Sequence, residues 1–409
     1  LSAAPAPAAA ASAVPAALAR TAAAVHPAAD APAPGAFGAG KALFDGAAPN
    51  LSGRAGAPGP GWSLGSFDSE AGGRTFYKYR PGLKGGSVRV YAGGLALNES
   101  FESLYRGRES PRASQYFLWT RAHPPTAWTP TKSPLEADAK DLARLIVTAA
   151  RESGAKSVEL ALHSYGAMVF QRMVQLRTSD ARAARRLLAG SRVVLLNATT
   201  HYKDSERKTG REATQIADAA RTFGDWLDMI DAAAAAWRSA ARLNPLLWPQ
   251  AEAFQAAWDF QREQALSAAS RGAINMMQKD LAGPWPGADA VRAALLKDFD
   301  ADSPNPGWQE ALARRSADAF RLEFTRRDVT RLRRLGVRVE TILAAQDQLL
   351  NWESEKLLLD LLGIPAPATK PAPGTVLSDP SGLFTARVVD GDHYFPLKKS
   401  AELSRLLER

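Results

Sequence analysis

The stretch from Ser157 to Leu176, which reads S-V-E-L-A-L-H-S-Y-G-A-M-V-F-Q-R-M-V-Q-L, changes its hydrophobic periodicity in the middle. Apolar residues alternate before Ser164, as in a strand, and recur at helical spacing after it. The sequence therefore predicts a strand that becomes a helix at Ser164 with almost no loop. Such a turn exposes the Ser164 hydroxyl at the C-terminal edge of a sheet and places the Tyr165 amide at a helix N-terminus, where an anion can be held.

The L-H-S-Y-G segment at this turn resembles the G-x-S-x-G nucleophile elbow of the α/β-hydrolase family, with Leu162 where the family usually has glycine. Because that glycine keeps side chains out of a crowded turn, Leu162 is expected either to point into the sheet packing or to strain the elbow. The resemblance implies a mostly parallel sheet flanked by helices, with Ser164 as nucleophile and the Tyr165 amide in an oxyanion hole. The alternative is that Ser164 merely caps a helix.

A second candidate for the oxyanion hole follows an earlier predicted strand, S-V-R-V-Y-A over residues 87–92. This strand ends in the glycine pair Gly93-Gly94, and two glycines let a backbone approach a ligand closely. The A-G-G-L turn resembles the H-G-x turn of the family, without its histidine. The resemblance implies the Leu95 amide as the second donor, with Gly94 as its neighbour. A plain tight turn is the alternative.

The sequence contains five histidines, and elimination leaves one general base. The family order along the chain is nucleophile, acid, histidine, and only His393 follows any late acid. Its surroundings, G-D-H-Y-F-P, resemble the turn after the last strand of the family. For the acid, Asp347 directly follows a predicted strand, in A-A-Q-D-Q-L-L. Asp392 is expected to face away from the histidine, and Asp390 is the reserve candidate.

The domain organisation follows from where strand patterns occur. Residues 1–61 are rich in alanine, proline and glycine and read as a disordered leader or linker. Strand and helix patterns alternate over 62–203 and 331–409, which predicts an α/β fold with a mostly parallel sheet flanked by helices. Between them, residues 204–330 show no convincing alternating strand and are expected to form an inserted helical cap.

The predicted cap contains six of the ten tryptophans of the chain. Most of its aromatic residues are expected to form the core of the cap itself. A cap over a hydrolase site nevertheless presents one apolar face to the pocket. Trp226, Trp258 and Met276 are the residues expected to contact substrate there.

Composition limits the other function classes. The net charge of +9 comes from dispersed arginines, and the densest group, over 326–334, is expected to be a solvated helix face rather than a phosphate-binding patch, with no nucleic-acid partner. The absence of cysteine excludes disulfides, thiolate metal sites and a cysteine nucleophile. No histidine pair or carboxylate cluster suggests a metal, no cofactor is expected, and no apolar run is long enough to predict a transmembrane segment.

The resemblance implies a serine hydrolase, an esterase or lipase that takes a small-molecule ester and forms an acyl-enzyme on Ser164. The aromatic content of the cap favours an apolar acyl group. A peptidase, an amidase or an acyltransferase would use the same three residues, and a non-catalytic relative that binds a ligand is the other alternative. The chain begins at Leu1 without methionine, for which a removed export signal or a shortened chain would account; a periplasmic or secreted location is therefore an expectation.

Overall fold

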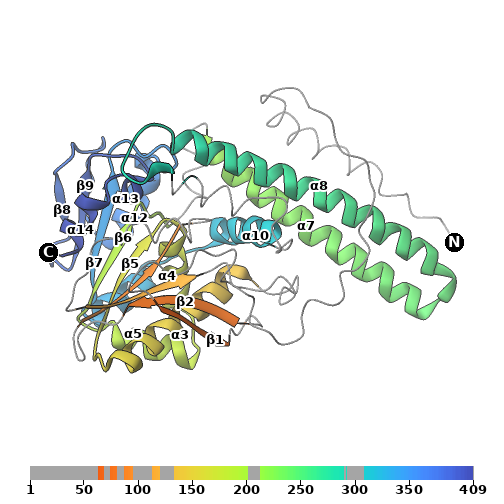
Figure 1. Ribbon diagram of the computed structural model, residues 1–409, viewed down its shortest axis with the longest axis horizontal. Helices are drawn as coiled ribbons and strands as arrows, with labels where there is room; N and C mark the ends of the chain where they lie inside the picture. The colour runs from red at the N-terminus through yellow and green to blue at the C-terminus, as the bar shows by residue number, and fades with distance from the viewer. Residues whose placement is uncertain are drawn as a thin grey trace. The chain divides into compact units, whose positions relative to one another are not determined.

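The computed structural model contains a nine-stranded sheet with helices packed against it (Figure 1). The structure describes residues 63–68, 74–80, 87–94, 113–119, 133–200, 212–289, 292 and 308–408. The chain divides into two compact units, 1–57 and 58–409, and all described residues belong to the second. The strands are β1 (Ser63–Asp68), β2 (Arg74–Arg80), β3 (Ser87–Ala92), β4 (Ala113–Trp119), β5 (Val158–His163), β6 (Arg192–Leu196), β7 (Arg338–Ala344), β8 (Val376–Ser378) and β9 (Phe384–Val389).

The strand order in the sheet is β1-β2-β4-β3-β5-β6-β7-β9-β8. The six strands from β4 to β9 in this order pair in parallel, and antiparallel pairs occur only towards the two edges of the described sheet. A mostly parallel sheet is therefore confirmed. In parallel sheets ligands bind at the C-terminal ends of the strands, where β3, β5, β6 and β7 lie side by side.

Both faces of the sheet are buried, because side chains alternate between two hydrophobic cores. In β5, Leu160 and Leu162 enter one core, whereas Ala161 enters the other. Residues of six helices pack in the first core: α3 (Pro134–Ser153), α4 (Tyr165–Gln175), α5 (Ser179–Leu187), α10 (Trp308–Arg321), α11 (Arg326–Arg334) and α12 (Trp352–Leu362). Residues of α13 (Phe395–Lys398) and α14 (Ser400–Leu407) pack in the second.

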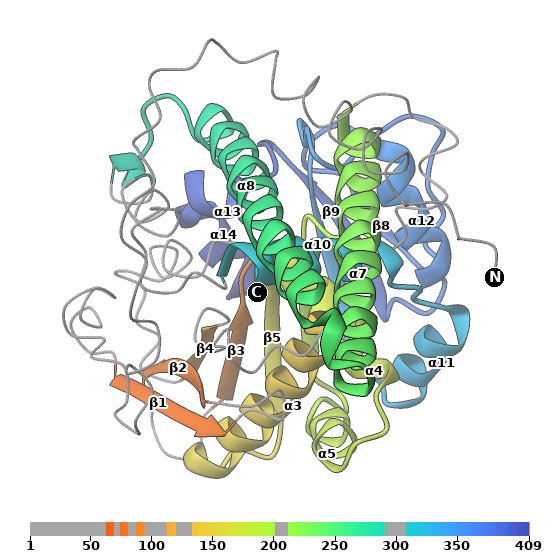
Figure 2. The ribbon, with the colours of Figure 1, turned by 90° about the vertical axis from the view of Figure 1, so that its right-hand side faces the viewer.

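The connection from β6 to β7 consists mainly of helices among its described residues. We call the four of its elements that precede α11 the β6–β7 helices: α7 (Glu212–Leu243), the short η5 (Pro245–Leu247), α8 (Trp248–Asp280) and α10 (Trp308–Arg321). Helices α7 and α8 run side by side as a hairpin, and α10 packs against both of them and against α3 (Figures 1 and 2). Among the helices of the described residues, none has both the length and the apolar character needed to cross a membrane.

Two strands of the sheet were not predicted from the sequence. Strand β1 has the pattern S-L-G-S-F-D, whose two large apolar residues are too few to indicate a strand. Strand β8 has three residues and lies in a proline-rich segment. Each pairs antiparallel with one neighbour at an edge of the described sheet. The backbone hydrogen bonds to β2 and β9, and not the side-chain pattern, therefore define β1 and β8 as strands.

Candidate active site

Ser164 lies at the turn between β5 and α4 with a strained backbone. Its φ is 50° and its ψ is −112°, a conformation that residues with a side chain rarely adopt. The Ser164 N–H donates to the carbonyl of Leu196 in β6 at 2.9 Å, so the neighbouring strand supports the turn. Tyr165 is the first residue of α4, and the first N–H groups of a helix have no acceptor within it. The predicted change from strand to helix at Ser164 is confirmed.

Gly166, two residues after Ser164, lies where the backbone leaves no space for a side chain. A Cβ added there would lie 2.5 Å from the carbonyl oxygen of Ala92 and 2.9 Å from that of Gly93, both of which are backbone atoms. Only a residue without a side chain allows α4 to approach the end of β3 this closely. The Gly93-Gly94 turn is therefore next to Ser164, and Gly94 is buried. Leu95, the predicted second oxyanion donor, lies outside the described residues.

Leu162, which stands in place of the first glycine of the elbow motif, packs into the sheet. Its side chain is fully buried in the core that also contains Val169 and Met173 of α4. Of the two outcomes expected for this residue, packing is thus the observed one. The leucine contributes to the core beneath the turn.

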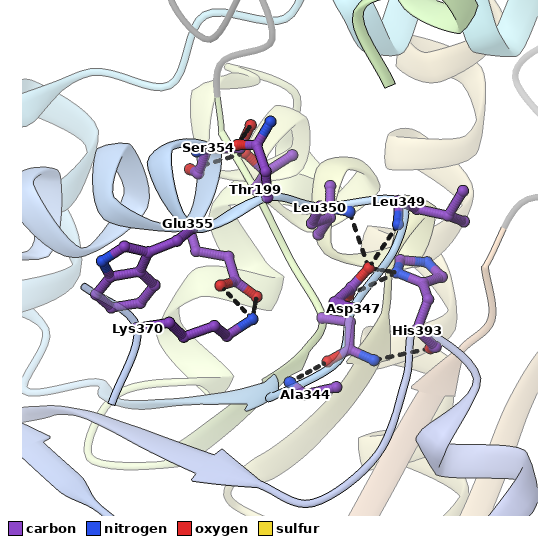
Figure 3. Close-up of polar contacts among 12 residues, drawn as sticks. Thr199, Ala344, Asp347, Leu349, Leu350, Ser354, Glu355, Lys370 and His393 are labelled. Carbon is purple, nitrogen blue, oxygen red and sulfur yellow. Dashed lines mark hydrogen bonds and ion pairs between the residues drawn. The ribbon is translucent and has the colours of Figure 1, made fainter. Parts of the chain in front are cut away.

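Asp347 and His393 come together from the loops that follow β7 and β9. The Nδ1 atom of His393 lies 2.9 Å from Oδ2 and 3.2 Å from Oδ1 of Asp347 (Figure 3). The Asp347 side chain is fully buried and that of His393 is 6% exposed. Oδ1 of Asp347 also accepts the backbone N–H groups of Leu349 and Leu350 at 2.9 and 2.8 Å, which hold the carboxylate in one orientation.

The other nitrogen of His393 reaches the serine. Its Nε2 lies 3.0 Å from Oγ of Ser164, so Asp347, His393 and Ser164 form one continuous hydrogen-bond chain. Because a carboxylate only accepts hydrogen bonds, Nδ1 carries the proton towards Asp347, and Nε2 is left as an acceptor for the serine hydroxyl. The structure thus brings together the three residues that were singled out from the sequence.

The other late aspartates have different partners. Asp392 pairs with Lys398 and accepts the N–H of Tyr394 at 2.9 Å, so its side chain faces away from the histidine ring, as expected. Asp390 is exposed and pairs with Lys399 at 2.5 Å. Among the described residues, no three side chains of the kinds that bind metals are grouped around one point.

Two buried residues hold the backbone of His393, and sequence reasoning missed both roles. The His393 carbonyl accepts from Nδ2 of Asn197 at 2.7 Å and lies 3.0 Å from Nε2 of His163. Oδ1 of Asn197 accepts the N–H of Ala344 at 3.0 Å, and Asn197 has a φ of 47°. An asparagine directly after a strand at this edge was the available signal. Asn197 thus ties the histidine loop to β6 and β7.

His163 is a buried, neutral imidazole. Burial, and to a smaller extent the nearby His393, lower its pKa to about 3. A carbonyl oxygen is the partner of Nε2, so Nε2 of His163 carries the proton and donates it. The residue supports the histidine loop and does not exchange protons near neutral pH.

A buried ion pair lies close to Asp347. Glu355, at the start of α12, is fully buried, and its Oε2 lies 2.6 Å from Nζ of Lys370 (Figure 3). Burial, and to a smaller extent the charge of Asp347, raise the pKa of Glu355 to about 8, although Lys370 opposes the shift. The pair was not predicted, because neither residue belongs to a motif.

The three residues expected to contact substrate lie in the β6–β7 helices. Trp258 of α8 is 4% exposed, its Nε1 donates to Oδ1 of Asp231 in α7 at 3.0 Å, and its ring packs edge-on against Trp226 with centroids 4.9 Å apart. These two tryptophans therefore join α7 to α8. Met276 is in α8 at a position whose side chain lies outside the described residues. Substrate contact by these three stays a prediction.

Comparison with solved structures identifies proteins of similar architecture. The 2-hydroxy-6-oxo-6-phenylhexa-2,4-dienoate hydrolase from Rhodococcus sp. strain RHA1 is similar with a TM-score of 0.51 and 11% identity, over 85% of this chain and 98% of that chain. The esterase RhEst1 from Rhodococcus sp. ECU1013 has a TM-score of 0.47 and 16% identity, over 85% and 98% of the two chains. The Cif epoxide hydrolase from Acinetobacter nosocomialis has a TM-score of 0.49 and 11% identity, over 86% and 90%.

No protein-family model matches the sequence, and no curated protein matches it either. At 11% identity, the likeness to the Rhodococcus hydrolase shows a shared fold and not a shared activity. The function therefore has to be inferred from the site.

Proposed function

We propose that this chain, which has the α/β-hydrolase fold, is a serine hydrolase that cleaves carboxylic esters of apolar acyl groups. The observation that carries the proposal is the hydrogen-bond chain from Asp347 through His393 to Ser164, which ends at a strand-to-helix turn. A serine hydroxyl is a poor nucleophile until a positioned base takes its proton. The base works best when a carboxylate holds its other nitrogen.

The reaction proceeds through an acyl-enzyme. Oγ of Ser164 attacks the ester carbonyl while Nε2 of His393 accepts the hydroxyl proton, and Asp347 stabilises the imidazolium that results. When the tetrahedral intermediate collapses, the histidine returns the proton to the departing alcohol. A water molecule then gives a proton to Nε2 of His393 and attacks the acyl carbonyl. When this second intermediate collapses, His393 returns the proton to Oγ of Ser164, which releases the acid and restores the serine.

The negative charge that develops on the carbonyl oxygen needs donors that are already in place. The backbone N–H of Tyr165 is one donor, because it lies at the N-terminus of α4 directly after the nucleophile. By resemblance to the family, the Leu95 amide is the second, with Gly94 beside it. The close approach of Gly166 to the end of β3 supports this assignment. One such donor contributes about 3 kcal/mol to transition-state stabilisation in comparable sites.

The apolar acyl group is inferred from the tryptophans of the β6–β7 helices, since apolar ligands are bound by pockets with few polar groups. The same three residues would also cleave amides or transfer an acyl group to another alcohol. A non-catalytic binding protein would use none of this chemistry. Product analysis with ester, amide and added alcohol separates the three reactions.

A fluorophosphonate probe and p-nitrophenyl esters of increasing acyl length test the proposal. We expect labelling and turnover by the wild type and neither in Ser164→Ala. His393→Ala is expected to lose turnover, and Asp347→Asn to retain a trace, about 10⁴-fold below the wild type, because the histidine loses its correct tautomer. The double variant of Ser164 and His393 should be hardly worse than either single variant.

The folded state of each variant is checked by thermal unfolding, so that a loss of turnover is not a loss of fold. Full ester turnover in His393→Ala would exclude this mechanism. A folded wild type that is neither labelled nor active on any ester would indicate a ligand-binding protein instead.

A further inference from the structure

Arg315 forms a buried ion pair that connects α10 to α3. Its Nε donates to Oδ2 of Asp138 at 2.7 Å, and its Nη2 donates to Oδ1 at 3.2 Å. The Arg315 side chain is 6% exposed and the Asp138 side chain is fully buried. The two-pronged contact sets the geometry as well as the charge balance. A helix of the β6–β7 connection is therefore held on the sheet-flanking helix α3 in one register.

The same carboxylate holds the residue that follows the nucleophile. The Tyr165 hydroxyl donates to Oδ2 of Asp138 at 2.7 Å, and Tyr165 is 4% exposed. Burial, and then the charge of Asp138, raise the pKa of the Tyr165 hydroxyl well above its ordinary value, so the hydroxyl stays protonated as a donor. The Tyr165 side chain is thus fixed at its far end, while its backbone N–H lies at the start of α4.

A second contact fixes α10 against the N-terminus of α3. Oδ2 of Asp318, three residues after Arg315, lies 2.5 Å from the Ser133 hydroxyl and accepts the N–H of Leu135 at 3.3 Å. Ser133 is the N-cap of α3, and its Oγ accepts the N–H of Glu136. Helix α10 therefore contacts α3 at two positions one turn apart, and Asp138 is held between Arg315 of α10 and Tyr165 of α4.

The neighbouring arginine of α10 holds a different element. Nη1 and Nη2 of Arg314 each lie 2.5 Å from a carboxylate oxygen, of Asp228 and Asp231 respectively, both in α7. The Arg314 side chain is 7% exposed, nearly the same as that of Arg315. The two adjacent residues are equally buried and equally charged. One joins the β6–β7 helices to each other, and the other joins them to the residue beside Ser164.

We propose that Arg315 is a positioning residue for the oxyanion donor: through Asp138 and the Tyr165 hydroxyl it makes the position of the Tyr165 backbone N–H depend on how α10 packs on α3. This inference rests on the proposed function. Any movement of the β6–β7 helices that shifts α10 changes the alignment of this N–H. The packing of α10 thereby influences the rate of the chemical step.

The proposal predicts an effect on kcat rather than on KM. The Tyr165 N–H contacts negative charge that is present only in the transition state, so a displaced N–H leaves ester binding unchanged and slows the reaction. Complete loss of one donor costs about 10² to 10³ in kcat, and a donor that is retained but misaligned is expected to cost about tenfold.

The test compares Tyr165→Phe, Arg315→Lys and Arg315→Gln with Arg314→Gln as the matched control, in the full chain. Kinetics with p-nitrophenyl acetate give kcat and KM, and the rate of fluorophosphonate labelling gives a second measure of oxyanion stabilisation. We expect kcat to fall about tenfold in Tyr165→Phe and Arg315→Lys, with KM within about twofold. Arg314→Gln is expected to retain the wild-type kcat.

A double variant distinguishes positioning from general destabilisation. Tyr165 and Arg315 act through the same carboxylate. The fold-loss in kcat of Tyr165→Phe/Arg315→Lys should therefore be much smaller than the product of the fold-losses of the two single variants. For Tyr165→Phe combined with Arg314→Gln, the fold-loss should equal the product of the two single fold-losses. If Arg315→Gln does not fold, the kcat of Arg315→Lys alone tests the proposal, because lysine keeps the charge but not the two-pronged contact.

The inference is overturned if the wild type hydrolyses the ester while Tyr165→Phe and Arg315→Lys keep its kcat, or if Arg314→Gln loses as much kcat as they do. An inactive wild type without Ser164-dependent labelling would instead contradict the proposed function, and the inference with it. The two failures are therefore distinguishable.

Discussion

Buried side chains around Ser164 hold a backbone conformation that is unfavourable by itself. A non-glycine residue with positive φ costs of the order of 1 to 3 kcal/mol and persists only where its surroundings enforce it. Ser164 is enforced on two sides, by the hydrogen bond of its N–H to Leu196 and by the packing of Leu162 beneath it. Gly166 removes the one side chain that would push α4 away.

His163 should make stability depend on pH on the acid side. Its folded pKa is about 3, below the ordinary histidine value, so the unfolded chain binds a proton more readily. The stabilisation is fully present above about pH 6.5 and is lost as pH falls towards the folded pKa. We expect the unfolding free energy of the wild type to fall about 2 kcal/mol more than that of His163→Gln between pH 7 and pH 5.

Denaturant unfolding at both pH values measures this difference. The glutamine side chain keeps an N–H group for the His393 carbonyl and cannot be protonated in this range. Equal losses in the two proteins would show that His163 binds a proton in the folded state, and would contradict the assigned neutral form.

At the scale of elements, the β6–β7 helices are held together by contacts of their own. Arg314 joins α10 to α7, and Trp258 joins α8 to α7 through Asp231. Large apolar side chains at the turn between α7 and α8 are exposed, Leu243 by 90% and Leu246 by 81%. Some large apolar side chains of these helices thus contact each other and others are exposed, so the apolar content alone does not identify the residues that contact a substrate.

We predict that α7 and α8 govern the choice of acyl chain, whereas the chemistry depends on the sheet domain and on the contact that α10 makes with it. Replacement of Trp226, Trp258 or Met276 by alanine should change the ratio of octanoate to acetate turnover by about tenfold or less per residue, as expected for a few lost methylene-sized contacts. Acetyl ester turnover should hardly change. Leu246→Ala at the exposed end of the hairpin is the control.

Turnover of p-nitrophenyl acetate and octanoate is compared across variants whose unfolding shows that they are folded. Because Trp258 is buried and hydrogen-bonded, its replacement also lowers stability, so Trp226 and Met276 are the more informative positions. Equal losses on both esters, or no loss on either, would show that the helices do not form the acyl pocket.

At the scale of the whole molecule, the first compact unit should be dispensable for the second. Residues 1–57 have few large apolar side chains and many alanines and prolines, so they can add little buried apolar surface. We expect the chain 58–409 to keep its ester turnover and to unfold within about 2 °C of the full chain, a difference below 1 kcal/mol. Calorimetry of the two proteins measures the difference in their unfolding temperatures. An unfolding temperature of the chain 58–409 far below that of the full chain would contradict the prediction.

Local periodicity was sufficient to predict the turn at Ser164 and the parallel sheet, and the resemblance to the family pointed to the two loops that carry Asp347 and His393. These features depend on neighbouring residues and on chain order, both of which a sequence displays directly. Elimination among five histidines identified His393, although it lies 229 residues from Ser164. The short strands β1 and β8 were missed because pairing, and not their own pattern, makes them strands.

Only the tertiary structure decided how Leu162 is accommodated, that Asn197 and His163 hold the His393 carbonyl, and that Arg315 reaches Asp138 across 177 residues. None of these contacts has a fixed spacing, because each joins side chains from elements that meet only when the sheet and the helices pack. A buried polar group needs a partner wherever the fold supplies one. The sequence by itself determined which groups can do chemistry, and packing determined what holds them in place.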